Sequence, residues 1–107
     1  MKTYNLDNFI KGWFVGKFEP TLFDTEAFEV ACKRYEAGDS EESHMHKIAT
    51  EVTLIAQGEV RMNGQKYVAG DIVVMEPGDW TDFQAISEVM TMVVKFPCVK
   101  NDKYYRF

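Results

Sequence analysis

Hydrophobic and polar residues alternate along several short runs of this chain, and turn-forming residues separate one run from the next. Alternation with a period of two is typical of a β-strand with one buried face, whereas an amphipathic helix repeats every 3.6 residues. The runs that predict strands are 28–35, 51–56, 60–62, 65–68, 72–75 and 89–96. Asn63-Gly64 lies between two of them and predicts a tight hairpin, because both residues tolerate the positive φ of a type I′ turn. Short strands separated by glycine and proline predict an all-β sandwich or barrel.

The two ends of the chain carry weaker patterns. Residues 5–11 predict one helical turn with an Asx cap. The aromatic segment 13–18 predicts either a strand or a segment that lies across the mouth of the barrel. Residues 99–107 are mostly polar, which predicts a surface tail, with Tyr105 and Phe107 as the side chains that could dock it.

Length and composition favour one folded domain. The 107 residues are 46% hydrophobic and 27% charged, which is ordinary for a globular protein. No repeat or linker-like segment interrupts them, so we expect a single domain over residues 1–107 with the core barrel at about 26–97. Residues 1–7 lack the apolar run of a secretory signal and no segment is apolar enough to span a membrane, so we expect a cytoplasmic protein.

The charge balance argues against nucleic acid and membranes as partners. Seventeen acidic residues against twelve basic ones give a formal net charge of −5, and the lysines and arginines are dispersed along the chain. Binding to a polyanion or an anionic membrane needs a concentrated positive surface. Cys32 and Cys98 are far apart in the sequence, which favours free thiols with packing roles in a reducing compartment.

Two histidines one residue apart on a strand point to the same face, because side chains alternate with a period of two. His44 and His46 have this spacing. If the chain turns at 47–50 and pairs back antiparallel, Glu51 aims at the same point. Two imidazoles and one carboxylate form the facial ligand set of non-haem iron sites, and this set also accepts other divalent metals. The pattern therefore predicts a divalent-metal site for Fe, Mn, Ni or Zn and leaves the metal open.

The residues around this cluster follow a known pattern. Gly38, five residues, His44, one residue, His46, four residues, Glu51, six residues and Gly58 resemble the first conserved motif of the cupin superfamily, G-x5-H-x-H-x4-E-x6-G. The resemblance implies the fold of a small single-domain cupin, a double-stranded antiparallel β-helix or jelly-roll barrel. It also implies a metal ion bound by the two histidines and the glutamate.

The second cupin motif, G-x5-P-x-G-x2-H-x3-N, is matched only in part. Gly70 and Gly78 are in place, Pro77 is one position late, Thr81 stands where the fourth ligand would be, and Ala85 replaces the asparagine. A neutral hydroxyl is a poor ligand for a transition metal. The resemblance therefore implies at most three protein ligands, with water or substrate at the remaining positions.

Further polar and aromatic side chains could line a pocket. The residues that we predict to bind a substrate are Arg34, Tyr35, Tyr67 and Thr81. Arg61 and Trp80 are weaker candidates, because such residues on short strands more often pack or face solvent. The acidic run 39–42, just before the histidines, predicts a solvated loop.

Two functions from different classes fit these residues. The first is a small metal-dependent enzyme that binds a polar small molecule beside the metal and performs isomerase, lyase or dioxygenase chemistry. The alternative is a non-catalytic module that binds a carbohydrate or another metabolite and has a weak or vestigial metal site. Apolar residues occupy both faces of the strand 51–56, which predicts a homodimer because a monomer would leave one of these faces in water.

Overall fold

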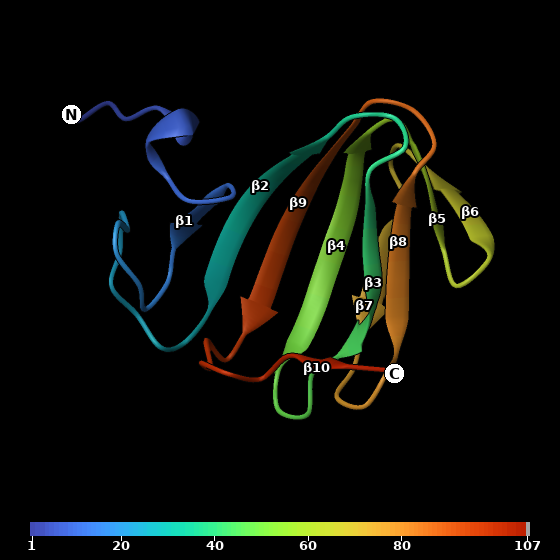
Figure 1. Ribbon diagram of the computed structural model, residues 1–107. Helices are drawn as coiled ribbons and strands as arrows, with labels where there is room; N and C mark the ends of the chain where they lie inside the picture. The colour runs from blue at the N-terminus through green and yellow to red at the C-terminus, as the bar shows by residue number, and fades with distance from the viewer. Residues whose placement is uncertain (107) are drawn as a thin grey trace.

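Two antiparallel β-sheets pack face to face in the computed structural model, which describes residues 1–106 (Figure 1). The first sheet has the order β1 (Trp13–Val15), β2 (Glu29–Tyr35), β9 (Val89–Phe96), β4 (Thr50–Gln57) and β7 (Ile72–Met75). The second has the order β10 (Tyr104–Tyr105), β3 (Ser40–Met45), β8 (Thr81–Ala85), β5 (Glu59–Met62) and β6 (Gln65–Val68). This arrangement confirms the predicted all-β jelly-roll barrel.

Strands with a regular alternation were predicted well. The runs 65–68, 72–75 and 89–96 coincide with β6, β7 and β9. The hairpin between β5 and β6 has Asn63 at φ 51° and Gly64 at φ 79°, both positive as a type I′ turn requires. These strands follow the alternation because one face of each packs against the interior of the barrel while the other does not.

The inward-facing residues change from polar to apolar along the strands. On β4, Glu51 and Thr53 are followed by the fully buried Ile55, and on β8, Thr81 is followed by Phe83. The buried apolar cluster consists of Ile55, Val60, Met62, Met75, Phe83, Ala85 and Val89. Burying a large apolar side chain contributes roughly 1.5–3 kcal/mol. The apolar part of the interior therefore holds the sheets together, and the polar part is left to carry a site.

Residues 47–49 carry the chain from β3 in the second sheet to β4 in the first. The expectation that the chain turns here and pairs back antiparallel on β3 is therefore wrong. Both edges of β3 are occupied by β8 and β10, and both edges of β4 by β7 and β9. As a consequence, the two histidines and Glu51 approach one another from opposite sheets, across the interior of the barrel.

The acidic run 39–42 lies largely in the first half of β3, and the prediction of a solvated loop is wrong there. Glu41 pairs with Phe83 of β8 and accepts a hydrogen bond from the hydroxyl of Tyr35. Glu42 is exposed. These charges are compatible with a strand, because the carboxylate of Glu41 has a polar partner inside the barrel and the carboxylate of Glu42 faces water.

The N-terminal segment forms the predicted turn and an edge strand. One turn of 3-10 helix, η1 (Leu6–Asn8), is capped by Asn5, whose Oδ1 accepts a hydrogen bond from the backbone N–H of Asp7 at 2.9 Å. Within the aromatic segment 13–18, β1 pairs with β2, so the strand alternative is the one found. No helix among the described residues is long and apolar enough to cross a membrane.

The C-terminal segment 102–106 is bound to the second sheet, in contrast to the predicted surface tail. β10 pairs with β3, with Tyr105 opposite His44, and Asp102 is only 4% exposed. Tyr105 thus docks the segment as expected, whereas Phe107 lies outside the described residues. The polar composition of this segment concealed its attachment, because a buried carboxylate provides part of it.

Candidate metal and ligand site

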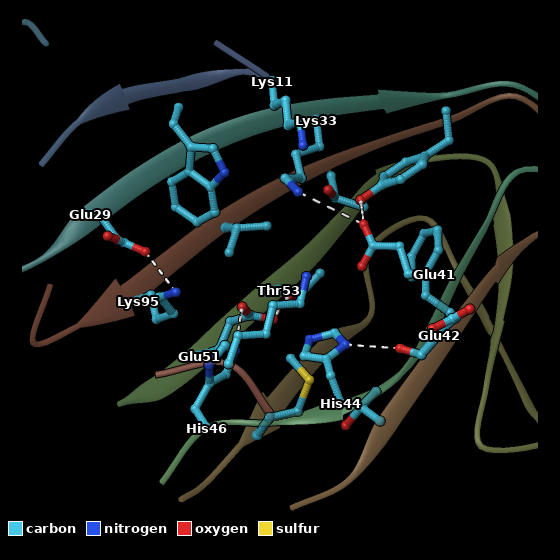
Figure 2. Close-up of a pocket in the computed structure, with 18 of the residues that line it drawn as sticks. Lys11, Glu29, Lys33, Glu41, Glu42, His44, His46, Glu51, Thr53 and Lys95 are labelled. Atoms are coloured by element: carbon cyan, nitrogen blue, oxygen red, sulfur yellow. Dashed lines mark hydrogen bonds and ion pairs between the residues drawn. The ribbon is translucent and has the colours of Figure 1, made fainter. Parts of the chain in front are cut away.

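A cavity of about 710 Å³ lies between the two sheets, at the polar part of the interior. Its volume is typical of small-molecule sites, which measure roughly 300–1,000 Å³. His44 on β3 and His46 directly after β3 line it from one side and Glu51 on β4 from the other, so the structure brings the predicted metal ligands to one cavity. Figure 2 shows these side chains together with the other charged residues that surround the same space.

Backbone carbonyl groups hold both imidazole rings. The Nδ1 atom of His44 lies 3.0 Å from the carbonyl oxygen of Glu42, and that of His46 lies 2.7 Å from the carbonyl oxygen of Asp102. Because a carbonyl oxygen can only accept, each Nδ1 carries the hydrogen and donates it. In the neutral ring this leaves the lone pair on Nε2, as in histidines that bind metal ions through that atom.

The Nε2 atom of His46 is buried and has no hydrogen-bond partner among residues 1–106. Oε1 of Glu51 lies 3.5 Å from it, and the hydroxyl of Thr53 donates to the other oxygen of that carboxylate at 3.5 Å. A neutral His46 and an ionised Glu51 would present lone pairs to each other, which is unfavourable in a buried place. A cation between them, a proton or a metal ion, removes the conflict.

The pKa shifts favour the forms of these groups that bind metal. Burial lowers the pKa of His44 below its usual value, although the carbonyl group of Glu42 opposes the shift. Burial raises the pKa of Glu51. The hydrogen bond and charge of His46, with the charges of Lys95 and His44, lower it by more, so the pKa lies below the usual value. At neutral pH the carboxylate is therefore ionised and His44 is neutral.

The donor chemistry fits a divalent cation, because imidazole nitrogen and carboxylate oxygen are ligands for the transition metals predicted from the sequence. The rings of His44 and His46 lie edge to face with their centroids 5.4 Å apart. In the part of the chain that the structure describes, no three His, Cys, Asp or Glu side chains already form a metal-binding group. His46 and Glu51 face each other directly, and His44 stands beside this pair.

Two of the four predicted substrate-binding residues also line the cavity. Thr81 is 6% exposed and lies directly opposite His44 in the pairing of β3 with β8. Tyr35 lines the cavity from β2, and its ring packs against Phe83 with the centroids 4.5 Å apart. The position of Thr81 next to His44 agrees with the register that the second motif assigned to it.

Arg34 and Tyr67 do not line this cavity, and their role in binding a substrate stays a prediction. Arg34 stands between Lys33 and Tyr35 on β2, and adjacent residues of a strand point to opposite faces. Its guanidinium group therefore faces outwards, 3.8 Å from the carboxylate of Asp7. Tyr67 packs against the apolar core from β6, at the edge of the second sheet.

The weaker candidates Arg61 and Trp80 lie outside the cavity as well. Arg61 is exposed, because its neighbours on β5 take the inward positions. The guanidinium group of Arg106 lies 4.4 Å from the centre of the Trp80 ring. Neither side chain is available to a molecule bound near the histidines.

Several charged and aromatic residues of the cavity were missed. Lys33 and Lys95 lie 5.5 Å from the centre of the Trp13 ring, and all three line the cavity. Lys33 could have been found, because it shares the inward face of β2 with Tyr35 at a spacing of two. The sequence did not indicate that Glu41 lines the cavity, because the direction of its side chain depends on an irregularity in the pairing of β3.

No protein-family model and no curated protein matches the chain. Solved structures match its fold. An uncharacterized conserved protein with a double-stranded β-helix domain from Klebsiella pneumoniae aligns over 97% of this chain and 90% of its own, with a TM-score of 0.73 and 17% identity. KdgF from Halomonas sp. aligns over 72% of this chain and 74% of its own, with a TM-score of 0.65 and 17% identity. The DMSP lyase DddQ from Ruegeria pomeroyi aligns over 82% of this chain and 47% of its own, with a TM-score of 0.68 and 20% identity.

These similarities establish the class of fold. The chain has a double-stranded β-helix, which is the fold that the motif from Gly38 to Gly58 implied. An RmlC-like cupin from Shewanella frigidimarina has the same fold, with a TM-score of 0.64 and 17% identity over 72% of this chain and 71% of its own. At such identities the likeness concerns the fold alone, and the chemistry has to be argued from the side chains.

Proposed function

We propose that this chain binds a divalent metal ion through His44, His46 and Glu51, and that it binds and transforms a polar small molecule in the adjoining cavity. The observation that carries the proposal is the buried Nε2 atom of His46, which has no hydrogen-bond partner among the described residues and faces Glu51 at 3.5 Å. When bound, the ion would polarise an oxygen atom of the small molecule or activate water.

The chain's own residues support a role in binding a polar molecule. Thr81 is neutral and lies opposite His44, so a coordination position on that side is left for water or substrate. Trp13 supplies an apolar surface, and Lys33 and Lys95 supply charged hydrogen-bond donors next to it. The occurrence of a lyase with this fold is compatible with an enzymatic role.

A second function is favoured by one observation. The three predicted ligands do not form a closed metal-binding group, because His44 stands beside the His46–Glu51 pair. A protein of this kind could bind a carbohydrate or another metabolite without catalysis, with a weak or vestigial metal site. Metal content separates the two functions, since the enzyme needs about one ion per chain and the binding module needs none.

The test is elemental analysis of protein purified without added metal, followed by titration with Fe²⁺, Mn²⁺, Ni²⁺ and Zn²⁺. We expect one ion per chain. Loss of a residue that only hydrogen-bonds a metal ligand typically weakens metal binding roughly 10–100-fold, and we expect His46→Ala, which removes a ligand itself, to weaken binding by more than this. Glu88→Gln is the matched control, because this carboxylate is exposed and does not line the cavity. Unchanged metal content in both His44→Ala and His46→Ala would refute the site.

A further inference from the structure

We propose that Glu41 is the general acid–base of the cavity, which takes a proton from the bound molecule and returns it. This inference rests on the proposed function and adds a class of substrate. The substrate is a small hydroxycarbonyl compound, whose carbonyl oxygen lies at the His44–His46–Glu51 end and whose adjacent C–H bond faces Glu41. All four side chains line the same cavity (Figure 2).

A β-bulge brings Glu41 into the cavity. Glu41 pairs with Phe83 and His44 pairs with Thr81, so three steps along β3 correspond to two steps along β8, and the register shifts between them. Without this shift Glu41 and His44 would point to opposite faces, because three steps reverse the direction of a side chain. Bulges are frequent next to active sites, where they redirect a side chain. The irregularity therefore places the Glu41 carboxylate on the same side of β3 as His44, in the cavity that the predicted metal ligands line.

One oxygen of this carboxylate is fixed and the other is uncommitted. The hydroxyl of Tyr35 donates to Oε1 of Glu41 at 2.7 Å, and Nζ of Lys33 lies 3.8 Å from the same oxygen. Burial, and then the charge of Glu41, raise the pKa of Tyr35 well above its usual value, so this hydroxyl keeps its proton and stays a donor. No described residue forms a hydrogen bond or ion pair with Oε2.

The other carboxylates of the cavity are engaged or exposed. Glu29 is within 2.8 Å of Nζ of Lys95 through one oxygen and accepts a hydrogen bond from the Cys98 thiol at 2.8 Å through the other. Glu51 faces His46. The exposed carboxylates that border the cavity are Glu19, Glu42 and Asp82. Glu41 is thus the half-buried carboxylate that has a free oxygen and a defined orientation.

The proposed step moves a proton and needs no oxidant. The C–H bond next to the carbonyl group breaks, its proton goes to Oε2 of Glu41, and its electron pair moves towards the carbonyl oxygen to give an enediolate. Protonated Glu41 then returns the proton to the former carbonyl carbon, while the hydroxyl proton of the enediolate passes to the former carbonyl oxygen. These two transfers give the isomerised product and restore the carboxylate. General acid–base catalysis of this kind contributes about 10²–10⁴-fold to a rate.

Hydrogen exchange of a probe tests the assignment. Dihydroxyacetone is incubated in D₂O with the full chain loaded with Zn²⁺, and the loss of its C–H signal is followed by NMR. The wild type should exchange this hydrogen faster than Zn²⁺ in buffer, and Glu41→Gln should slow the exchange at least about 100-fold. The variant should keep the Zn²⁺ affinity and melting temperature of the wild type. The matched control Glu88→Gln, at an exposed carboxylate that does not line the cavity, should exchange at the wild-type rate.

Three other results separate the possible failures. Exchange by Glu41→Gln at the wild-type rate would overturn the role of Glu41. A wild type that binds Zn²⁺ but exchanges no faster than the buffer would overturn this acid–base role with its substrate class, and the metal site would stand. A wild type that does not bind Zn²⁺ would overturn the proposed function itself.

Discussion

Thr81 is the residue at which the site departs most from a four-ligand arrangement. It is buried, lines the cavity and lies opposite His44, so an imidazole at this position would reach the same space. We expect Thr81→His to tighten binding of a divalent metal at least about tenfold, which corresponds to roughly 1.4 kcal/mol. Isothermal titration of both proteins with the same metal measures the difference.

The matched control for this change is Gln84→His. Gln84 also lies on β8, is exposed and does not line the cavity, so a histidine there should leave metal affinity unchanged. Equal affinities for the wild type and Thr81→His would mean that a side chain at position 81 does not reach the ion. An added ligand should also lower any activity, because it would occupy a position that substrate needs.

The pKa of His44 gives the proposed metal site a pH dependence. Only the neutral imidazole binds a metal, and burial lowers the pKa of His44, so binding should persist down to the usual histidine range near pH 6.5 and fall below it. A metal present at 100 times its Kd stabilises the fold by about 2.7 kcal/mol. A chelator should therefore lower the melting temperature clearly at pH 8 and hardly at pH 5. An equal effect at both pH values would argue against histidine ligation.

Among the elements, the C-terminal segment 102–106 contributes most to the shape of the site. The carboxylate of Asp102 accepts hydrogen bonds from the backbone N–H groups of Lys47, Ile48 and Ala49, at 2.9–3.2 Å. The carbonyl group of Asp102 accepts the hydrogen bond from His46. One residue thus holds the segment that crosses between the sheets and orients His46, a predicted metal ligand.

Replacing Asp102 by asparagine should destabilise the fold by about 1–3 kcal/mol at pH 7, because a charged acceptor of buried N–H groups is lost. Burial raises the pKa of Asp102, but the three N–H groups and His46 bring it below its usual value. The carboxylate therefore stabilises the fold above the unfolded value of about 3.9 and loses this effect as the pH falls through the lower folded value. Urea unfolding of wild type and variant should differ at pH 7 and converge towards pH 2.

A turn elsewhere in the chain supplies the control for this experiment. Asp79 accepts a single hydrogen bond, from the N–H of Glu76 at 2.9 Å, in an exposed turn. We expect Asp79→Asn to cost less than about 1 kcal/mol. Equal losses for the two variants would show that burial adds nothing to the contribution of Asp102.

Alternation along single strands predicted much of the fold and part of the site. It placed β6, β7 and β9, and it showed that His44 and His46 share a face. It could not show that residues 47–49 cross between sheets, because pairing of distant strands leaves no local pattern. It also missed Glu41, since a bulge reverses the direction that regular alternation assigns, and it missed Asp102, whose partners are backbone groups more than fifty residues away.

For the whole molecule, the outer face of the first sheet predicts association. Ile72 and Val74 on β7 are 62% and 54% exposed, and they pair with Leu54 and Val52 of β4. Contiguous apolar surface of this kind commonly marks an interface. We expect a homodimer through this face, with a buried area near the standard of about 800 Å² per partner.

Light scattering at micromolar concentration tests the dimer. The wild type should have the mass of two chains, and Val74→Lys should have the mass of one, because a charge would be buried without a partner. Val68→Lys is the control, since Val68 is 42% exposed on β6 of the other sheet. A wild type that is monomeric under these conditions, or a dimer that survives Val74→Lys, would contradict the assignment of this face.

The place of β9 in the first sheet governs how the chain can fold during its synthesis. β9 lies between β2 and β4, both of which leave the ribosome well before it (Figure 1). Until β9 is made, each of these strands keeps an open edge that another chain could pair with. Contacts this distant in sequence typically form in milliseconds to seconds. The nascent chain is therefore most prone to aggregation after β2 and β4 have been synthesised and before β9 has paired with them. A chaperone that covers the open edges of β2 and β4 would be most useful at that stage.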